Sequence, residues 1–483
     1  MQKKKIGRNE QCECGSGKKH KKCCLGIDEK LKDVNVFEEL DKLNVGSERI
    51  KKRIIKTVNT LYKKPGMAIS AASESPAEAK AIYRLLANKK FKKETLLEAH
   101  KKAVIEKIQE KRIKTILCPQ DTAELNYTGL KATEGLGNVA KESSTAKGLM
   151  MHTAIALTEE GVSLGLLHQK IWSREGYKKL TSTEKPKIPI EEKESYKWIE
   201  ALDEITKELP RDIRVITICD REGDIYELFC RANEKKQEYL VRAKSNRNTN
   251  EGKKLFNIIK DEKVSGKVVV NIPRDTRNGI KEREATLTIK YKKVEIKKPK
   301  DLKGYKDSIT INIVLAVEED PPKGITPISW YLTTNIDILS FEDAVKMVRW
   351  YVHRWKIERF HFVLKSGCKV EEIQSSETTR LIKLITLLSL IAIKILTITY
   401  FAREYPETTC EEFFTEEEWK TLYIMANQTR DIPNKIPTIK EAVYYLGRLG
   451  GFLGRKSDKD PGAECIWRGL HDLNIIIRYK NIL

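Results

Sequence analysis

Two aspartates end apolar stretches of the chain, and both could bind a divalent cation. Asp121 follows Thr115-Ile-Leu-Cys-Pro-Gln, and Asp220 follows Ile216-Thr-Ile-Cys. A carboxylate at the end of a buried strand is costly unless it caps a turn, pairs or binds a cation. Either aspartate alone is more simply explained as the cap of the next turn. Two of them on neighbouring strands of a basic chain favour a Mg²⁺ site, because Mg²⁺ uses few carboxylates and keeps its other positions for water and phosphate oxygens.

A third carboxylate lies in a helix that we predict from Ser340 to about Lys365. Tyr351, Arg354, Glu358 and Lys365 stand at i, i+3, i+7 and i+14. At about 100° per residue, all four project from one stripe about 60° wide. As an active-site wall the stripe makes sense, because Glu358 completes the metal site and the cations bind DNA phosphates. Spacing alone favours a salt-bridged surface stripe, with Arg354 and Glu358 as an i,i+4 pair.

Four cysteines gather near the start of the sequence. Cys12, Cys14, Cys23 and Cys24 form C-x-C-x8-C-C within thirteen residues. Four thiolates on so short a loop match tetrahedral zinc, and the surrounding lysines and arginines favour thiolates over thiols. The alternative is a reduced, lysine-rich tail with incidental cysteines. The other six cysteines are scattered, and we expect them to be small buried side chains: Cys118, Cys219, Cys230, Cys368, Cys410 and Cys465.

The zinc stretch also resembles the SEC-C motif, over about twenty residues. That resemblance implies a zinc-holding docking module for protein or ribosome contacts, and no part in catalysis.

Composition bounds the size and the partner of the protein. The chain has 483 residues, which suggests about three domains. Forty per cent of the residues are hydrophobic, enough to bury real cores, so wholesale disorder is excluded. Lys and Arg number 91 against 69 Asp and Glu, a net charge of +22. This surplus implies a polyanionic partner, most simply nucleic acid, although a ribosomal or membrane-surface protein could share it.

One segment is long and apolar enough to need a transmembrane test. Residues 381–401 are almost wholly apolar, but Lys383 and Lys394 lie inside them. A central lysine costs about 3 kcal/mol on membrane-insertion scales. The basic first ten residues lead into no apolar core, which excludes a secretory signal. We therefore predict a buried helix of a soluble protein that has no membrane partner.

Hydrophobic spacing changes along the chain and predicts a mixed α/β protein. Residues 35–110 have helical spacing and many basic side chains, which fit either DNA-end recognition or an ordinary solvated face. From residue 114 the chain shows strands and two helical stretches in an RNase H-like order. We expect an all-β insertion over about 250–325, a strand at 330–334 and mixed helices to the end. The predicted core strands are 115–121, 151–157, 163–172, 214–220 and 238–244, and the helical stretches are 191–209 and 225–233.

The four-residue stripe is a complete family signature. Tyr351-x2-Arg354-x3-Glu358-x6-Lys365 resembles the Y-x2-R-x3-E-x6-K (YREK) motif of the insertion-sequence-four family of bacterial DDE transposases, in its Tn-five branch. The similarity runs from about residue 35 to the C-terminus, and the zinc motif lies outside it. Further matching strings are Asp121-Thr-Ala-Glu-Leu-Asn-Tyr, Gly165-Leu-Leu-His-Gln, Cys219-Asp220-Arg-Glu-Gly-Asp-Ile and Gly450-Gly-Phe-Leu-Gly-Arg-Lys-Ser-Asp-Lys-Asp-Pro-Gly.

The resemblance implies four regions. They are a zinc motif at 1–27, a helical DNA-end-binding domain at 35–108, an RNase H-like catalytic domain at 109–370 and a helical dimerisation domain at 371–483. It also implies cut-and-paste transposition, in which Asp121, Asp220 and Glu358 hold two Mg²⁺ or Mn²⁺ ions. Water nicks the transposon end, the freed 3′-hydroxyl forms a hairpin, and after hairpin opening it joins target DNA. The partners would be transposon-end DNA, target DNA and a second copy, in the bacterial cytoplasm at the nucleoid.

Hairpin chemistry needs a base that leaves the helical stack for an aromatic pocket. By resemblance, Trp330 would stack that base, with a plain core tryptophan as the alternative. Tyr351, Arg354, Trp355 and Lys365 would hold the flipped nucleotide and its phosphates, and Arg242 would lie near the cleaved strand. His353 and His361 share the predicted helix, and the sequence gives them no role in metal binding.

Two other functions compete with this interpretation. A non-catalytic DNA-binding regulator or inhibitor of transposition would be expected to lack a carboxylate or the N-terminal helices, and this chain keeps both. A metal-dependent nuclease of the RNase H class would need no base pocket, so Trp330 and the Tyr-Arg-Glu-Lys residues argue against it.

Overall fold

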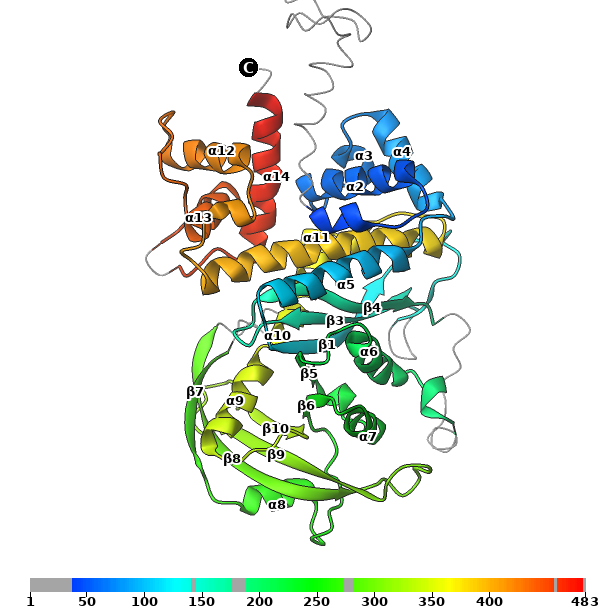
Figure 1. Ribbon diagram of the computed structural model, residues 1–483, viewed down its shortest axis with the longest axis vertical. Helices are drawn as coiled ribbons and strands as arrows, with labels where there is room; N and C mark the ends of the chain where they lie inside the picture. The colour runs from blue at the N-terminus through cyan, green and yellow to red at the C-terminus, as the bar shows by residue number, and fades with distance from the viewer. Residues whose placement is uncertain (1–36, 140–144, 175–187, 273–281, 456–457, 481–483) are drawn as a thin grey trace, which may run out of the picture.

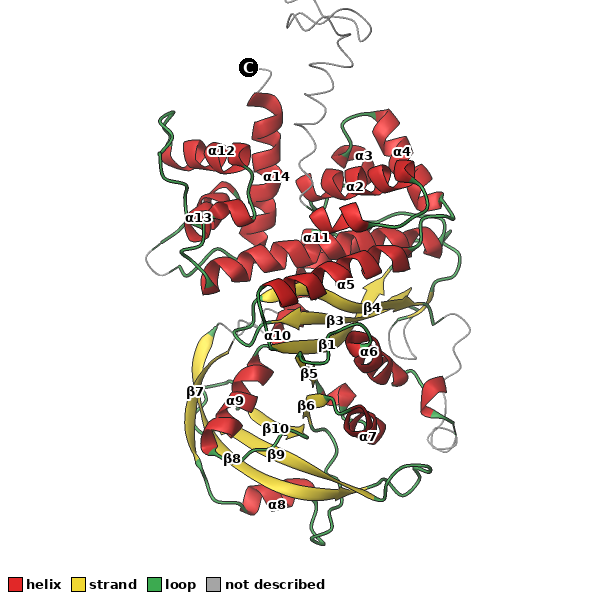
Figure 2. Cartoon of the chain, viewed as in Figure 1, coloured by secondary structure: helices red, strands yellow, loops and turns green. Residues whose placement is uncertain are grey.

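The computed structural model describes residues 37–139, 145–174, 188–272, 282–455 and 458–480. The four cysteines of the zinc stretch lie outside the described residues. The described chain is a mixed α/β structure built on one ten-stranded sheet (Figure 1). Helices cover the sheet and form a separate layer at one end of the molecule (Figure 2).

Five strands form the half of the sheet that carries the aspartates, and two helices connect some of them. The strand order is β4-β3-β1-β5-β6, with antiparallel β4–β3 and β3–β1 pairs and parallel β1–β5 and β5–β6 pairs. The helix α6 follows β4, and α7 connects β5 to β6, which is the element order predicted from the sequence. The bounds are β1 Thr115–Asn126, β2 Gly137–Asn138, β3 Lys147–Leu157, β4 Ser163–Trp172, η4 Ile190–Glu192, α6 Tyr196–Thr206, β5 Arg214–Cys219, η5 Arg221–Gly223, α7 Tyr226–Lys235 and β6 Glu238–Arg242.

The predicted all-β insertion over about 250–325 contains strands, but it is wrong in one respect. It begins with a helix, α8 (Leu255–Asp261), because Leu255, Ile258 and Ile259 are buried at helical spacing. Its strands extend the main sheet through β10, which pairs with both β6 and β9. These strands are β7 Gly266–Ile272, β8 Arg283–Lys297, β9 Ser308–Glu318 and β10 Ser329–Thr334.

The predicted single helix over 340–365 is also wrong. A capping box of Ser340 and Asp343 starts α9 (Phe341–Val352), α10 runs over Trp355–Phe362, and a π-helical turn, η6, covers Val363–Gly367. Between α9 and α10 the backbone tightens to i→i−3 hydrogen bonds, such as Lys356 N to His353 O at 2.9 Å. The chain therefore does not turn by 100° per residue from Tyr351 to Lys365. Helical spacing thus does not show that Lys365 projects from the same face as the other three residues.

The long helix α11 (Thr378–Glu404) packs on β4 and contacts helices from both ends of the chain (Figure 1). The N-terminal helices are η2 Glu38–Lys42, α2 Glu48–Lys63, α3 Ile69–Ala72, α4 Pro76–Ala87 and α5 Lys93–Glu110, of which α5 also packs directly on β4. After η7 Val370–Glu372 and α11 come η8 Cys410–Glu412, α12 Glu416–Asn427, α13 Ile439–Leu449 and α14 Ala463–Lys480.

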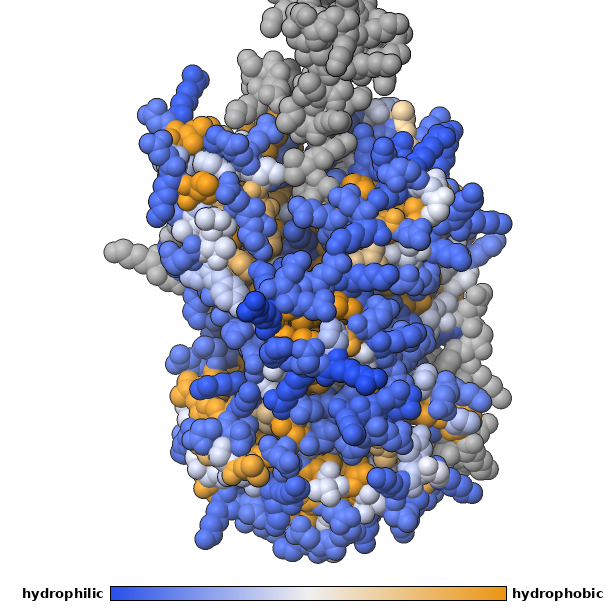
Figure 3. Space-filling view, in the orientation of Figure 1, coloured by the Kyte–Doolittle hydropathy of each residue, from blue (hydrophilic) through white to orange (hydrophobic). Residues whose placement is uncertain are grey.

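The helix α11 is long and apolar enough to cross a membrane, but 83% of its most apolar window is buried inside the protein. Lys383 donates to the carbonyls of Leu86 and Asn88 at 3.0 and 2.9 Å, and Lys394 lies over the ring of Phe413. The prediction of a buried helix is thus confirmed. Of the six scattered cysteines, all are buried except Cys465, which is half-buried. The face drawn in Figure 3 is largely hydrophilic, with apolar side chains in small groups.

Candidate active site where β1 and β5 part

Asp121 and Asp220 lie side by side at the point where β1 and β5 stop pairing. The last parallel pair is Pro119 with Ile218; Asp121 lies two residues further along β1, and Asp220 is the first residue after β5. Neighbouring strands are about 5 Å apart, and residues two apart share a face, so the two carboxylates are adjacent. The prediction that Asp121 ends a strand is wrong, because β1 continues to Asn126 and Asp121 pairs with Thr153 of β3.

The two aspartates differ in their surroundings. Burial raises the pKa of Asp220, and the negative charge of Asp121 adds to this effect, whereas a hydrogen bond from Glu222 N to Asp220 Oδ1 at 2.8 Å opposes it. Burial also acts to raise the pKa of Asp121, but the contact with His361 and the charge of Arg354 outweigh burial, so that pKa is lowered. Asp220 thus caps the turn η5, as the simpler alternative expected, and also faces a second carboxylate.

Glu358 reaches this region on α10, which packs against β1 and β3. Its Oε1 accepts a hydrogen bond of 2.6 Å from Nη2 of Arg354. Burial acts to lower the pKa of Arg354, but Tyr351, Glu358 and Asp121 together raise it. The guanidinium therefore lies among the carboxylates. The i,i+4 pair exists as the simpler alternative predicted, but it is mostly buried, with side chains 13% and 20% exposed.

Asp121, Asp220 and Glu358 offer the hard oxygen atoms that Mg²⁺ and Mn²⁺ prefer. Asp121 and Asp220 are already adjacent, whereas Glu358 is engaged by Arg354. Within the parts of the chain that the structure describes, no three Asp, Glu, His or Cys side chains converge closely enough to hold a metal ion. A metal site at these residues would need Glu358 to exchange its arginine partner for the ion.

His361 is a site residue that the sequence interpretation missed. Its Nδ1 lies 3.6 Å from Oδ2 of Asp121, and its side chain is 8% exposed. Its Nε2 is buried without a hydrogen-bond partner among the described residues. The sequence carried one signal for it, because His361 follows Glu358 by three residues and so shares a face of α10.

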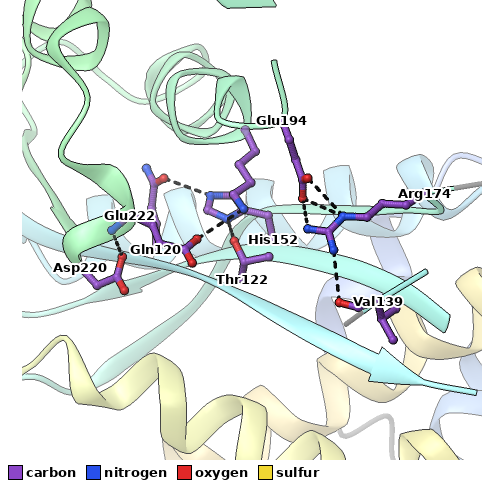
Figure 4. Close-up of polar contacts among 9 residues, drawn as sticks. Gln120, Thr122, Val139, His152, Arg174, Glu194, Asp220 and Glu222 are labelled. Atoms are coloured by element: carbon purple, nitrogen blue, oxygen red, sulfur yellow. Dashed lines mark hydrogen bonds and ion pairs between the residues drawn. The ribbon is translucent and has the colours of Figure 1, made fainter. Parts of the chain in front are cut away.

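A second missed histidine supports β1 from the other face of the sheet (Figure 4). His152 pairs with Thr122 on β1, with its Nδ1 2.9 Å from Thr122 Oγ1 and its Nε2 3.2 Å from Gln120 Oε1. Burial lowers the pKa of His152 well below its usual range, so the ring is neutral. Since an amide oxygen only accepts, Nε2 donates to Gln120 and Nδ1 accepts from the Thr122 hydroxyl. His152 thereby braces the two residues that flank Asp121.

Four of the residues implied by the family resemblance form a cluster beside the carboxylates. Burial raises the pKa of Tyr351, and the positive charges of Arg354 and Arg242 oppose this effect. The Arg354 guanidinium lies 5.8 Å from the centre of the Tyr351 ring, and that ring meets the Trp330 ring edge-on at 5.2 Å. Arg242 stands opposite Leu332 on β10, two residues from Trp330, so Arg242 and Trp330 share one face of the sheet. Burial lowers the pKa of Arg242, and the charge of Arg221 adds to this effect.

The remaining two implied residues lie differently. Trp355 begins α10, and its indole Nε1 is buried without a hydrogen-bond partner among the described residues. Lys365 lies in the π-helical turn, where its ammonium donates to Glu124 O at 2.5 Å and contacts Glu371 Oε1 at 3.1 Å. Glu124 is three residues beyond Asp121 on the same strand, so Lys365 lies along β1 from the aspartates.

Two further carboxylates follow Asp220 in the sequence, and each has a cation of the protein beside it. Glu222 is exposed and lies 3.6 Å from Lys197. Asp224 is not on the surface, because its side chain is 1% exposed and forms an ion pair of 2.6 Å with Arg247. It also accepts from the backbone N–H groups of Lys244 and Ser245. Asp224 therefore ties the turn after β5 to the loop after β6.

Comparison with known families adds an independent finding. Residues 36–91 match a transposase DNA-binding model, 198–393 a transposase DDE domain, 390–481 a Tn5 transposase dimerisation domain, and 8–26 a SEC-C motif. Among solved structures, the chain is similar to a cryo-EM structure of the piggyBac transposase synaptic complex with hairpin DNA. That match has 10% identity and a TM-score of 0.36, covering 90% of this chain and 73% of the other.

Proposed function

We propose, from the Tn5-type transposase DNA-binding, DDE and dimerisation domains that this chain carries, that it is a DNA transposase of the insertion-sequence-four family. The observation that supports this best is the place of Arg354, whose charge acts on Asp121 and Asp220 while it pairs with Glu358, inside a chain with a charge of +22. The strand order β4-β3-β1-β5-β6 supports an RNase H-like core within residues 109–370. Tyr351, Arg354, Glu358 and Lys365 lie within the matched DDE domain, which supports our assigning them to the YREK motif.

The three carboxylates would hold two Mg²⁺ or Mn²⁺ ions against a DNA end. Such ions activate water or a 3′-hydroxyl as a nucleophile and stabilise the leaving oxygen. The contribution of the protein is to hold the carboxylates in place. His152 braces β1 around Asp121, and His361 lies against Asp121 from α10. Arg354 would leave Glu358 for a DNA phosphate when Glu358 takes a metal ion.

The cluster beside the carboxylates would bind the nucleotides that flank the cleaved bond. Arg242 and Arg354, whose charges both act on Tyr351, would hold phosphates, and Trp330 would stack the flipped base that hairpin formation requires. The indole Nε1 of Trp355 has no hydrogen-bond partner among the described residues and is a donor suited to a phosphate oxygen. The reaction is then nicking, hairpin formation, hairpin opening and transfer of the 3′-end to target DNA, as for cut-and-paste transposition.

The regions outside the catalytic domain have their own proposed roles. Residues 35–108 would bind transposon ends and residues 371–483 would join two copies in the synaptic complex, in line with the DNA-binding and dimerisation matches. Residues 1–27 would bind Zn²⁺ through Cys12, Cys14, Cys23 and Cys24 and contact a protein or the ribosome, in line with the SEC-C match. We place the protein in the bacterial cytoplasm, at the nucleoid, with no membrane partner.

The test uses the full chain and duplex DNA cut from the sequences that flank its coding region. With Mg²⁺, the wild-type chain is expected to nick one flanking duplex and form a hairpin. Asp121→Asn, Asp220→Asn and Glu358→Gln each remove a metal-binding charge, so we expect no cleavage but unchanged DNA binding. Glu222→Gln is the matched control, because Glu222 is exposed beside Asp220, and it should cleave normally. Full cleavage by any of the three variants would refute the assignment.

The same experiment tests the alternative of an inactive DNA-binding regulator. One observation favours that alternative, because no three potential metal-ligand side chains converge in the described part of the chain. A regulator would bind the flanking duplex and leave it intact with Mg²⁺ and with Mn²⁺. A nuclease without strand transfer would cut the duplex and yield no hairpin.

A further inference from the structure

The ammonium of Lys365 is held by two oxygen atoms of the protein. It donates to Glu124 O on β1 at 2.5 Å and contacts Oε1 of Glu371 at 3.1 Å. The Lys365 and Glu371 side chains are 33% and 31% exposed, so the pair lies at the rim of the site and is open to solvent. A carboxylate in this place offers Lys365 the same kind of acceptor oxygen that a DNA phosphate would offer.

Glu371 is also held by the backbone at the end of β1. Its Oε1 also accepts from the backbone N–H of Asn126, at the end of β1, at 2.7 Å. The Tyr127 hydroxyl donates to Val370 O at 2.8 Å, which ties the short helix η7 to the end of β1. Glu371 is therefore anchored independently of Lys365, and it stays in place if the lysine turns away.

Lys365 itself lies in a π-helical turn. The π-helical turn over Val363–Gly367 is a less stable arrangement than an α-helical turn, and such turns concentrate at functional sites. A lysine side chain has four rotatable bonds and exchanges one oxygen partner for another without backbone movement. The rigid partner in the pair is thus the carboxylate, and the adaptable one is the cation.

We infer that Glu371 competes with a DNA phosphate for Lys365 and so sets how tightly the chain holds DNA at this site. The inference rests on the proposed function, in which Lys365 binds a phosphate. When a phosphate binds Lys365, the ion pair between Lys365 and Glu371 breaks, and Glu371 takes up a cation from the solvent. Fewer ions are released overall, so the intact chain binds DNA more weakly and with a shallower salt dependence than a chain without this charge.

The variant Glu371→Gln isolates the charge. Its amide oxygen can still accept from Asn126 N–H, so the anchor is kept while the ion pair is lost. The matched control is Glu372→Gln, which makes the same change of net charge one residue away. Glu372 is 68% exposed and pairs with Lys369 at 3.3 Å, and it does not contact Lys365 through any bond in the described residues.

The measurement is the Kd of the full chain for a fluorescein-labelled duplex of about 40 base pairs from the flanking DNA, by anisotropy at several salt concentrations. Glu371→Gln should lower the Kd about three- to tenfold at low salt, with the gain shrinking as salt rises. Glu372→Gln should match the wild type. In a Lys365→Ala background, Glu371→Gln should bring no gain, because its only effect passes through the lysine.

Unchanged or weaker binding by Glu371→Gln overturns the inference, as does an equal gain from Glu372→Gln or a gain that persists without Lys365. A failure of the proposed function looks different. If Lys365→Ala alone binds DNA as well as the wild type, Lys365 is not a phosphate ligand. If the wild-type chain does not bind the duplex, the transposase assignment itself fails. Thermal unfolding of each variant checks that all of them are folded.

Discussion

Nη2 of Arg354 donates to Oε1 of Glu358 at 2.6 Å, so two of the four signature residues occupy each other. In the proposed function, Glu358 belongs to a metal ion and Arg354 to a phosphate. A metal ion that binds Glu358 would free Arg354 for a phosphate, and a phosphate that binds Arg354 would free Glu358 for a metal ion. Binding of metal and binding of DNA should therefore be coupled. The mostly buried position of the pair strengthens this coupling, because water screens it poorly.

The coupling predicts opposite effects of one substitution on two ligands. Arg354→Ala removes a positive charge from among the carboxylates, so the chain alone should bind Mn²⁺ more tightly, by about tenfold, while it binds duplex DNA more weakly. Isothermal titration with Mn²⁺ and DNA anisotropy measure the two effects. Arg349→Ala is the control, since Arg349 is exposed on α9, and it should leave Mn²⁺ binding unchanged. Weaker Mn²⁺ binding by Arg354→Ala would contradict the model of exchange.

His361 provides a second prediction, because it contacts Asp121 from a buried position on α10. A side chain that orients a metal ligand typically contributes about 10- to 100-fold to metal affinity or activity. His361→Ala should therefore raise the Mg²⁺ concentration needed for half-maximal nicking by about that factor. The readout is a Mg²⁺ titration of the nicking rate, with thermal unfolding measured in parallel. A variant that loses stability but keeps the wild-type Mg²⁺ requirement would show that His361 only fills space.

Trp330 separates two steps of the proposed reaction. Its ring meets Tyr351 edge-on at 5.2 Å beside Arg242, and stacking of one base on an aromatic ring contributes about 1–3 kcal/mol. Trp330→Ala should slow hairpin formation about tenfold or more and leave the first nick near the wild-type rate, whereas Trp330→Phe should keep most of both. Gel analysis of nicked and hairpin products at successive times measures the two steps. Equal loss of both steps would indicate a core tryptophan instead.

The sequence predicts the main elements well where the signal is local. Alternation and helical spacing depend on neighbours within a few residues, so the core strands, the two crossover helices and the buried α11 were predictable. The adjacency of Asp121 and Asp220 then follows from parallel pairing of their strands. The short α8 was missed because three buried residues in seven give a weak periodicity.

The site departs from the sequence prediction where distant contacts decide the local geometry. The π-helical turn ends at Gly367, which packs so closely on Trp467 of α14 that a side chain there would clash, and it holds Lys365 against Glu124 of β1. These partners are about 100 and 241 residues away in the sequence. Asp224 is likewise buried by Arg247, 23 residues later. The sequence pattern around each of these residues therefore gives no sign of its distant partner.

A last prediction concerns stability, and it depends on His168 of β4. Burial lowers the pKa of His168 to about 4; Glu204 opposes this effect, whereas Lys170, Lys101 and Lys93 add to it. In the unfolded chain the pKa is about 6.5. Between these values the unfolded chain binds a proton that the folded chain does not, so the free energy of unfolding falls as pH falls from about 6.5 to 4. The slope from this one group is at most about 1.4 kcal/mol per pH unit.

His168→Gln should remove this contribution, and urea unfolding at several pH values measures it. From pH 6.5 to 4.5, the free energy of unfolding should fall less for the variant than for the wild type. This difference holds even if the substitution lowers the free energy of unfolding by the same amount at every pH. Some acid sensitivity should remain, because burial also lowers the pKa of His353 to about 4 and acts in the same direction. The neutral ring of His168 has a buried Nε2 without a partner among the described residues, so a proton there would find no acceptor. Parallel stability curves for the variant and the wild type across this pH range would show that His168 is protonated equally in both states.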